Sequence, residues 1–231
     1  MNSKRGINKE HKYIIPTYVG FLQQIVYKIT QGYEYVHIGY LDLNKKNKFE
    51  KIDRKIIDQY IADASTSRRY NNKKSGRANF VYYRHKNIYI IMMATQKFNG
   101  KETKTSEKIV ITEQFNHFEK GDKLVITFND YREFRIGRGE DDKVTVFMSD
   151  DMYNDVAARL LSHNDSKRFD YVVRDFNKLN GLPAWQGINR QRFKLKRRLL
   201  KQSQFKKKEL EAYAERFKIW TKRTNVKVFE G

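Results

Sequence analysis

The spacing of apolar residues changes twice along this chain of 231 residues, and this constrains the fold more than any other feature. Between Tyr18 and Ile29 apolar residues recur three and four positions apart, and Gly32 follows, which predicts a first helix. Aromatic and β-branched runs, typical of strands, dominate between residues 33 and 147. Helical spacing then returns from residue 149 onward. The pattern predicts an α+β fold.

The middle of the chain holds all the strands that we expect. One covers residues 33–43, and helical spacing interrupts the series between Ile52 and Ile61. Two runs between residues 79 and 94 flank a polar turn at residues 84–87, which indicates a hairpin. The remaining strand-like runs are residues 109–111, 124–128, 132–136 and 144–147. We therefore expect an antiparallel sheet of about five to six strands with helices packed against it, followed by a basic helical C-terminal region.

Two polar segments without periodicity separate these runs. Residues 63–77 are rich in Arg, Lys, Asn and Ser, and residues 96–108 are similarly polar. Both are predicted to be loops, the first of them strongly basic.

The last third of the chain is predicted to be helical. Ser149 or Asp150 can cap one helix, and a second carries apolar residues between Phe169 and Leu179. The sequence Gly-Leu-Pro at 181–183 ends it, because proline cannot continue a helix. We therefore expect a body of residues 1–180 and a helical extension of residues 181–231.

The extension carries most of the chain's positive charge. Residues 188–227 contain fifteen Lys or Arg and three acids, which is more than half of the net charge of +21. On a helical wheel of about 100° per residue, Ile188, Leu195 and Leu199 share one side, and cations occupy the opposite side. A second apolar stripe runs from Leu210 to Trp220. Both helices are therefore expected to dock on the body with their cations outward.

Such a dense row of cations predicts a polyanionic partner, most simply nucleic acid. Each phosphate that a cation neutralises releases condensed counterions, which adds affinity independent of sequence. Three glutamates within the segment weigh against a membrane surface, so we expect no membrane partner. The candidate binding residues of this segment are Arg190, Lys194, Arg197, Arg198, Lys201, Lys206, Lys207 and Lys208.

A second basic element precedes the predicted hairpin. Its cations run into an aromatic strand, where Tyr82 could stack on a base while the basic residues hold phosphates. This combination favours RNA or single-stranded DNA over duplex DNA. The candidate cations of this element are Arg68, Arg69, Lys73, Lys74 and Arg77.

Two short fragments resemble RNA-recognition-motif domains. Residues 36–41 (Val-His-Ile-Gly-Tyr-Leu) are similar to the first short motif of that family, and residues 80–83 (Phe-Val-Tyr-Tyr) to the end of the second. The resemblance covers ten residues. The family has a strand where residues 63–77 show none, and the Gly-aromatic start of its second motif is missing.

The alternative function is a nuclease or a replication-initiation endonuclease that holds its substrate on the same basic surface. Rolling-circle initiators and relaxases place two His on one strand, and His37 supplies only the first of them. His37 or His85 could also serve a metal-free ribonuclease, because His titrates near neutral pH. Asp42 stands where a first Mg²⁺ ligand would, and Glu113, Asp122 or the acids at 140–142 could join it.

Nothing in the sequence fixes a catalytic residue, so the catalytic site stays unknown. The chain has no Cys, its five His lack zinc-ligand spacing, and no phosphate-binding Gly-rich loop is present. We therefore expect no metal site and no cofactor.

Composition indicates where the protein works. The absence of Cys fits a reducing compartment, and the longest apolar run, residues 88–94, is too short to span a bilayer. We therefore expect a cytoplasmic protein. Heavy use of Lys, Asn, Ile and Tyr suggests an AT-rich mobile element or phage, in which the chain could be a ribonucleoprotein subunit with protein partners.

Overall fold

The computed structural model describes residues 12–95, 109, 111–120, 123–129, 131–222 and 226–229. The chain divides into two compact units, the first formed by Met1–Leu124 with Val226–Gly231 and the second by Val125–Asn225. The predicted boundary between residues 180 and 181 falls inside the second unit, because the helices after it share a core with those before it.

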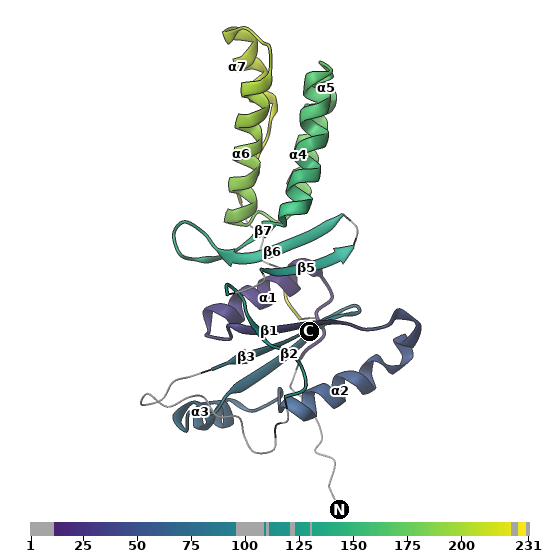
Figure 1. Ribbon diagram of the computed structural model, residues 1–231, viewed down its shortest axis with the longest axis vertical. Coiled ribbons are helices and arrows are strands. Elements are labelled where there is room, and N and C mark those ends of the chain that lie inside the picture. Colours follow the sequence, from purple (N-terminus) through teal and green to yellow (C-terminus); the bar gives the residue numbers. More distant parts are fainter. Residues whose placement is uncertain are drawn as a thin grey trace, which may run out of the picture. The chain divides into compact units, whose positions relative to one another are not determined.

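The first unit contains a four-stranded antiparallel sheet with the strand order β2-β3-β1-β4 (Figure 1). Helix α1 (Tyr18–Thr30) precedes the sheet and is capped by Thr17, whose hydroxyl accepts a hydrogen bond from the Gly20 N–H. The other elements are β1 (Tyr35–Tyr40), the 3₁₀ helix η1 (Leu43–Lys48), α2 (Phe49–Tyr60), α3 (Thr66–Lys74), β2 (Asn79–His85), β3 (Ile88–Ala94) and β4 (Asn116–His117).

Helix α3 overturns the predicted loop at residues 63–77. The helix is capped by Ser65, whose hydroxyl accepts a hydrogen bond from the Arg68 N–H, and none of the helix's own residues is buried. It has no apolar stripe, so hydrophobic spacing could not reveal it. The second predicted loop, residues 96–108, lies outside the described residues.

A buried charge pair stabilises the centre of the first unit. Asp53 on α2 accepts hydrogen bonds from Arg84 Nε at 2.9 and 3.0 Å, and from the Tyr82 hydroxyl at 2.5 Å. Burial and the neighbouring Asp53 carboxylate raise the pKa of Tyr82, so the hydroxyl stays protonated and donates a hydrogen bond to the carboxylate. These contacts join α2 to β2.

The second unit combines a three-stranded sheet, order β5-β6-β7, with four helices that stand on one side of it (Figure 1). The helices share one apolar core, to which Leu160, Phe176, Leu199 and Tyr213 each contribute from a different helix. The elements are β5 (Leu124–Asn129), β6 (Arg132–Arg138), β7 (Val144–Met148), α4 (Asp150–Asp165), α5 (Phe169–Lys178), the 3₁₀ helix η2 (Leu179–Gly181), α6 (Gln186–Gln202) and α7 (Lys207–Arg216).

The predicted α+β class is confirmed, but a single sheet of five to six strands is wrong. Strand β5 is in the sheet of β6 and β7, not in that of the earlier strands. Ile109 and Ile111 lie outside strands, and β4 is only two residues long. The last helix ends at Arg216, before the predicted apolar stripe does, and Trp220 is 67% exposed.

Within the ranges that the structure describes, no helix combines the length and the apolar character that crossing a bilayer requires.

Candidate nucleic-acid interface

Helix α6 attaches to the edge of the three-stranded sheet through polar contacts with β7. The Gln191 side chain accepts a hydrogen bond from the Met148 N–H at 2.8 Å and donates one to the Met148 carbonyl at 3.1 Å. The Gly187 N–H donates to the Thr145 hydroxyl. Because β7 is an edge strand, its backbone groups have no further strand to pair with, and Gln191 satisfies two of them.

Gly187 allows this close approach. A Cβ at this position would lie 2.5 Å from the Val146 carbonyl oxygen and 2.6 Å from the Phe147 ring. Any larger residue would therefore push the start of α6 away from β7.

The attachment leaves an open hollow between α6 and the β6–β7 hairpin, which we call the basic groove. Its volume is about 490 Å³. It is lined by Arg135, Arg138, Gly139, Glu140 and Phe147 from the hairpin, and by Gly187, Arg190, Gln191, Phe193, Lys194 and Arg197 from α6.

Cations dominate this lining. Five of its side chains are Lys or Arg, and Glu140 is the one acid among them. Glu140 pairs with Arg190 at 3.5 Å, but its side chain is 86% exposed, so this ion pair is weak. Lys194 and Arg197 form no ion pair with any residue that the structure describes. The groove therefore holds an excess of positive charge.

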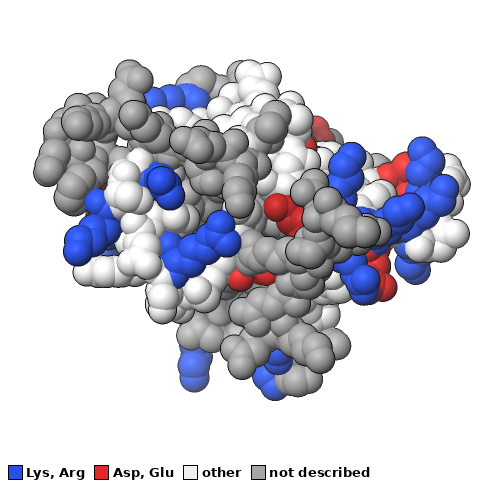
Figure 2. All heavy atoms as spheres, turned by 90° about the horizontal axis from the view of Figure 1, so that it is seen from below, with Lys and Arg blue, Asp and Glu red and all other residues white. Residues whose placement is uncertain are grey.

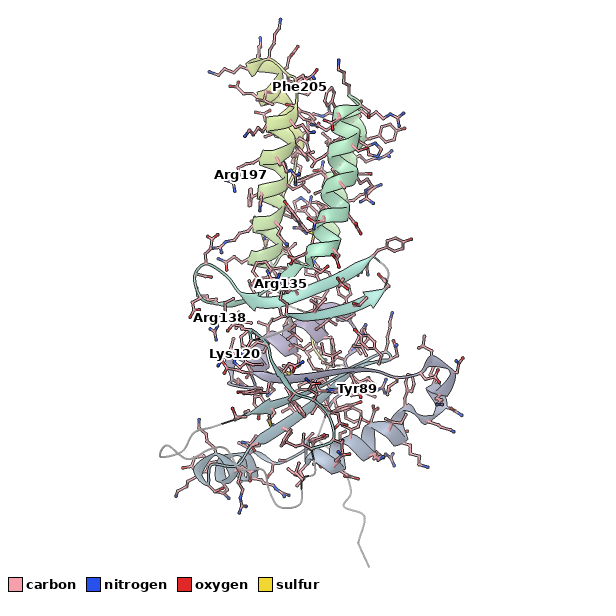
Figure 3. The ribbon with its side chains drawn as sticks, viewed as in Figure 1. Tyr89, Lys120, Arg135, Arg138, Arg197 and Phe205 are labelled. Atoms are coloured by element: carbon pink, nitrogen blue, oxygen red, sulfur yellow. The ribbon has the colours of Figure 1, made fainter. Side chains whose placement is uncertain are left out.

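Two aromatic rings accompany the cations. The Arg135 guanidinium lies over the Phe147 ring, 4.2 Å from its centroid, and the absence of a side chain at Gly137 leaves room for it. Arg135 Nε is buried without a hydrogen-bond partner among the described residues. Phe193 on α6 is 46% exposed. Figure 3 labels Arg135 and Arg138 on β6, and Arg197 on α6.

A buried arginine on the inner side of α6 holds the helix in place. Arg192 is 1% exposed and donates to the carbonyls of Leu179 and Leu182 and to Asn189 Oδ1. Burial lowers the pKa of Arg192 to about 10, so the side chain remains charged at neutral pH. Its charge adds to that of the outer face.

The structure brings together only some of the predicted binding residues of the C-terminal region. Arg190, Lys194 and Arg197 line the basic groove. Arg198 and Lys201 are exposed on α6 but are not part of the lining. Lys206, Lys207 and Lys208 are exposed at the start of α7 and also lie outside it.

The predicted basic element of the first unit is an exposed helix surface. Arg68, Lys73, Lys74 and Arg77 are exposed, whereas Arg69 is half-buried and donates to the Ala62 carbonyl. Figure 2 shows the side of the first unit that carries α2 and α3, with Lys and Arg side chains in blue.

The prediction that Tyr82 stacks on a base is wrong for this structure. Tyr82 is 0% exposed, and its hydroxyl is bound to Asp53. Every residue of β2 is buried, so the strand has no free aromatic face.

Sequence reasoning missed Arg135, Arg138 and Phe193. Arg135 alternates with the buried Phe134 and Ile136, which places it on the other face of β6. That alternation was a usable signal. The local sequence contains no signal that this face of β6 lies opposite α6.

The candidate catalytic residues have structural partners. Asp42 accepts from the Asn44 N–H, and this hydrogen bond lowers the pKa of Asp42. The buried His85 ring contacts the Ile15 carbonyl through Nδ1, and His37 Nδ1 contacts the Gln114 carbonyl. Asp122 lies outside the described residues. Within these residues, no three His, Cys, Asp or Glu group closely enough to hold a metal ion.

Comparison of the chain with protein-family models, with curated proteins and with solved structures finds no match.

Proposed function

We propose that this protein binds nucleic acid and that the basic groove of the second unit contacts its phosphate backbone. The observation that carries this proposal is the lining of the groove, in which five cations from two separate elements face one exposed acid. A chain rich in Lys has many exposed cations, so cations on the surface of one helix alone would be weak evidence. Here a second element, the β6–β7 hairpin, places two arginines opposite those of α6.

The spacing within the groove suits phosphates. Arg190, Lys194 and Arg197 lie four and three residues apart on α6, which places them about one helical turn, ~5.4 Å, from each other. Arg135 and Arg138 lie on the opposite wall. Arginine presents several N–H donors in a planar fork that matches phosphate oxygens, so one phosphate can be held from both sides.

The salt dependence of binding tests the proposal. The variant Arg190→Gln/Lys194→Gln/Arg197→Gln removes three groove cations, none of which is needed by a buried carboxylate. We expect the slope of log affinity against log salt to become shallower by about 2–3, since each lost phosphate contact removes about 1. Fluorescence anisotropy with labelled RNA, single-stranded DNA and duplex DNA at several salt concentrations measures this slope.

A matched variant controls for net charge. Lys46→Gln/Lys51→Gln/Lys55→Gln also removes three exposed cations, all from the η1–α2 region of the first unit. It should reduce the slope much less than the groove variant does. Equal reductions would show that overall charge, and not the groove, determines binding. Failure of the wild-type protein to bind any of the three ligands would overturn the proposal.

A further inference from the structure

The aromatic ring of Phe193 on α6 is partly exposed and is not part of the apolar core that the helices share. Phe193 points away from the core that Leu195 and Leu199 form, and 46% of its surface meets solvent. Leaving this much of a phenylalanine exposed forgoes part of the ~1.5–3 kcal/mol that burial of such a side chain contributes. A polar residue would serve a solvated helix surface better.

Phe193 lies among the cations of the groove. Arg190 precedes it by three residues, Lys194 follows it directly, and Arg197 follows it by four residues. Residues three and four apart on a helix are neighbours. The ring is therefore flanked by side chains that can hold phosphates on either side of a stacked base.

The hairpin supplies a second flat group. Phe147 is covered on one face by the Arg135 guanidinium, and its ring is packed beside Gly187, so this pair is fixed in position. Guanidinium planes and aromatic rings both stack on nucleobases. The groove thus offers flat surfaces on both of its walls, at Arg135 and at Phe193.

The groove is large enough to hold a nucleotide. Its volume of about 490 Å³ is within the ~300–1,000 Å³ of sites that hold one small ligand. In a duplex the flat faces of the bases are stacked on each other and are not available to a side chain, whereas in a single strand they are free.

We infer that the basic groove selects single-stranded nucleic acid, with Phe193 stacking on an unpaired base and Arg190, Lys194 and Arg197 holding the flanking phosphates. This inference rests on the proposed function and names the class of ligand that the groove takes. It assigns the aromatic contact to α6, since the strand aromatic Tyr82 is buried.

The test separates the ring from the charge. Phe193→Leu keeps an apolar helix-forming residue and removes the ring, and Phe193→Tyr keeps a ring. We expect Phe193→Leu to weaken binding of single-stranded RNA and DNA about 5- to 150-fold, the range for loss of one stacked base. Phe193→Tyr should bind within about threefold of wild type. The salt slope should be unchanged in both variants, because no phosphate contact is lost.

An abasic oligonucleotide makes the test independent of the variant's folding. A strand of abasic sites keeps the phosphates but offers no base to stack on. Wild type should bind the abasic strand as weakly as Phe193→Leu binds the ordinary single strand. On the abasic strand, Phe193→Leu should bind with the same affinity as wild type. Duplex of the same length should bind wild type and Phe193→Leu equally.

The outcomes distinguish this inference from the proposed function. If wild type binds with a steep salt slope but Phe193→Leu loses nothing on single strands, the groove binds phosphates and the inference is wrong. Duplex binding as tight as single-strand binding would also overturn it. Absence of all binding by wild type would remove the proposed function itself.

Discussion

The two units of the chain each bury an arginine, but they satisfy its charge differently. In the first unit Arg84 forms an ion pair with the fully buried Asp53, whose Oδ2 lies 2.9 Å from Arg84 Nη2. In the second unit Arg192 is surrounded by neutral acceptors, and no described carboxylate pairs with it.

This difference determines how much positive charge each unit leaves uncompensated. The Arg84 charge is cancelled where it lies, so it contributes to stability and little to the surface potential. The Arg192 charge is not cancelled, and it lies on the same helix as the basic groove. The second unit therefore keeps positive charge that no described carboxylate compensates, and four substitutions test how the two units accommodate their cations.

The largest effect is expected from Arg84→Met. Removing one partner of a buried ion pair leaves the other charge uncompensated, which costs about 3–5 kcal/mol. The free energy of unfolding, measured with urea and far-UV circular dichroism, should fall by this amount. The exposed pair of Arg54 with Glu50 provides the control, since Arg54→Met should cost less than about 1 kcal/mol. Equal effects would mean that Asp53 finds other partners.

Arg192→Met should cost about 3 kcal/mol, because several buried carbonyls lose their donor but no buried charge is left behind. Both tryptophans of the chain, Trp185 and Trp220, lie in the second unit, so tryptophan fluorescence reports on this unit. Arg198→Met, at an exposed position of the same helix, should leave the transition unchanged. A loss as large for Arg198 as for Arg192 would refute the anchoring role of Arg192.

The same two arginines show how far sequence reasoning extends. Arg84 lies in the segment expected to be a polar turn, and Arg192 is one of the cations counted in residues 188–227. Local sequence does not reveal which cation a neighbouring element will cover. Most helices and strands were predictable, because burial of one face imposes a period on the residues that form it. Helix α3 buries none of its residues and was missed for that reason.

The candidate site was half predictable. One wall of the basic groove follows from helical spacing, which identified Arg190, Lys194 and Arg197. The other wall comes from a hairpin some fifty residues earlier in the chain, and its place depends on the contacts of Gly187 and Gln191 with β7. Such a long-range contact has no local signature. The prediction that Tyr82 stacks on a base was wrong because alternation of aromatic residues does not show whether both faces of a strand are covered.

Gly187→Ala tests whether this long-range contact forms the groove. The added methyl group would collide with the Val146 carbonyl, so α6 must move away from β7 at a cost of about 1–3 kcal/mol. Affinity for nucleic acid should fall together with stability, because the two walls separate. Gly181→Ala is the matched control, since a Cβ there meets no atom within 4 Å. An unchanged affinity in Gly187→Ala would show that α6 binds without the hairpin.

The smallest effect is expected on the pH dependence of stability, and it comes from a lysine that loses its proton when it is buried. Lys28 of the first unit lies against the rings of Tyr27 and Tyr33, and burial lowers its pKa to about 8. No described carboxylate pairs with it. Between pH 8 and its ordinary pKa of 10.5, the unfolded chain holds a proton that the folded chain has released, so stability rises with pH in this window.

Lys28→Met should remove this dependence. We expect the unfolding free energy of wild type to gain more than that of the variant between pH 8 and pH 10, as measured by urea unfolding at both values. Lys55→Met, at an exposed position of α2, should behave like wild type. Identical pH profiles for wild type and Lys28→Met would contradict the lowered pKa. Burial lowers the pKa of Arg192 only to about 10, so Arg192 keeps its charge among neutral carbonyls at pH 8, where Lys28 has already begun to lose its proton. Arg84 instead carries its charge beside the buried Asp53.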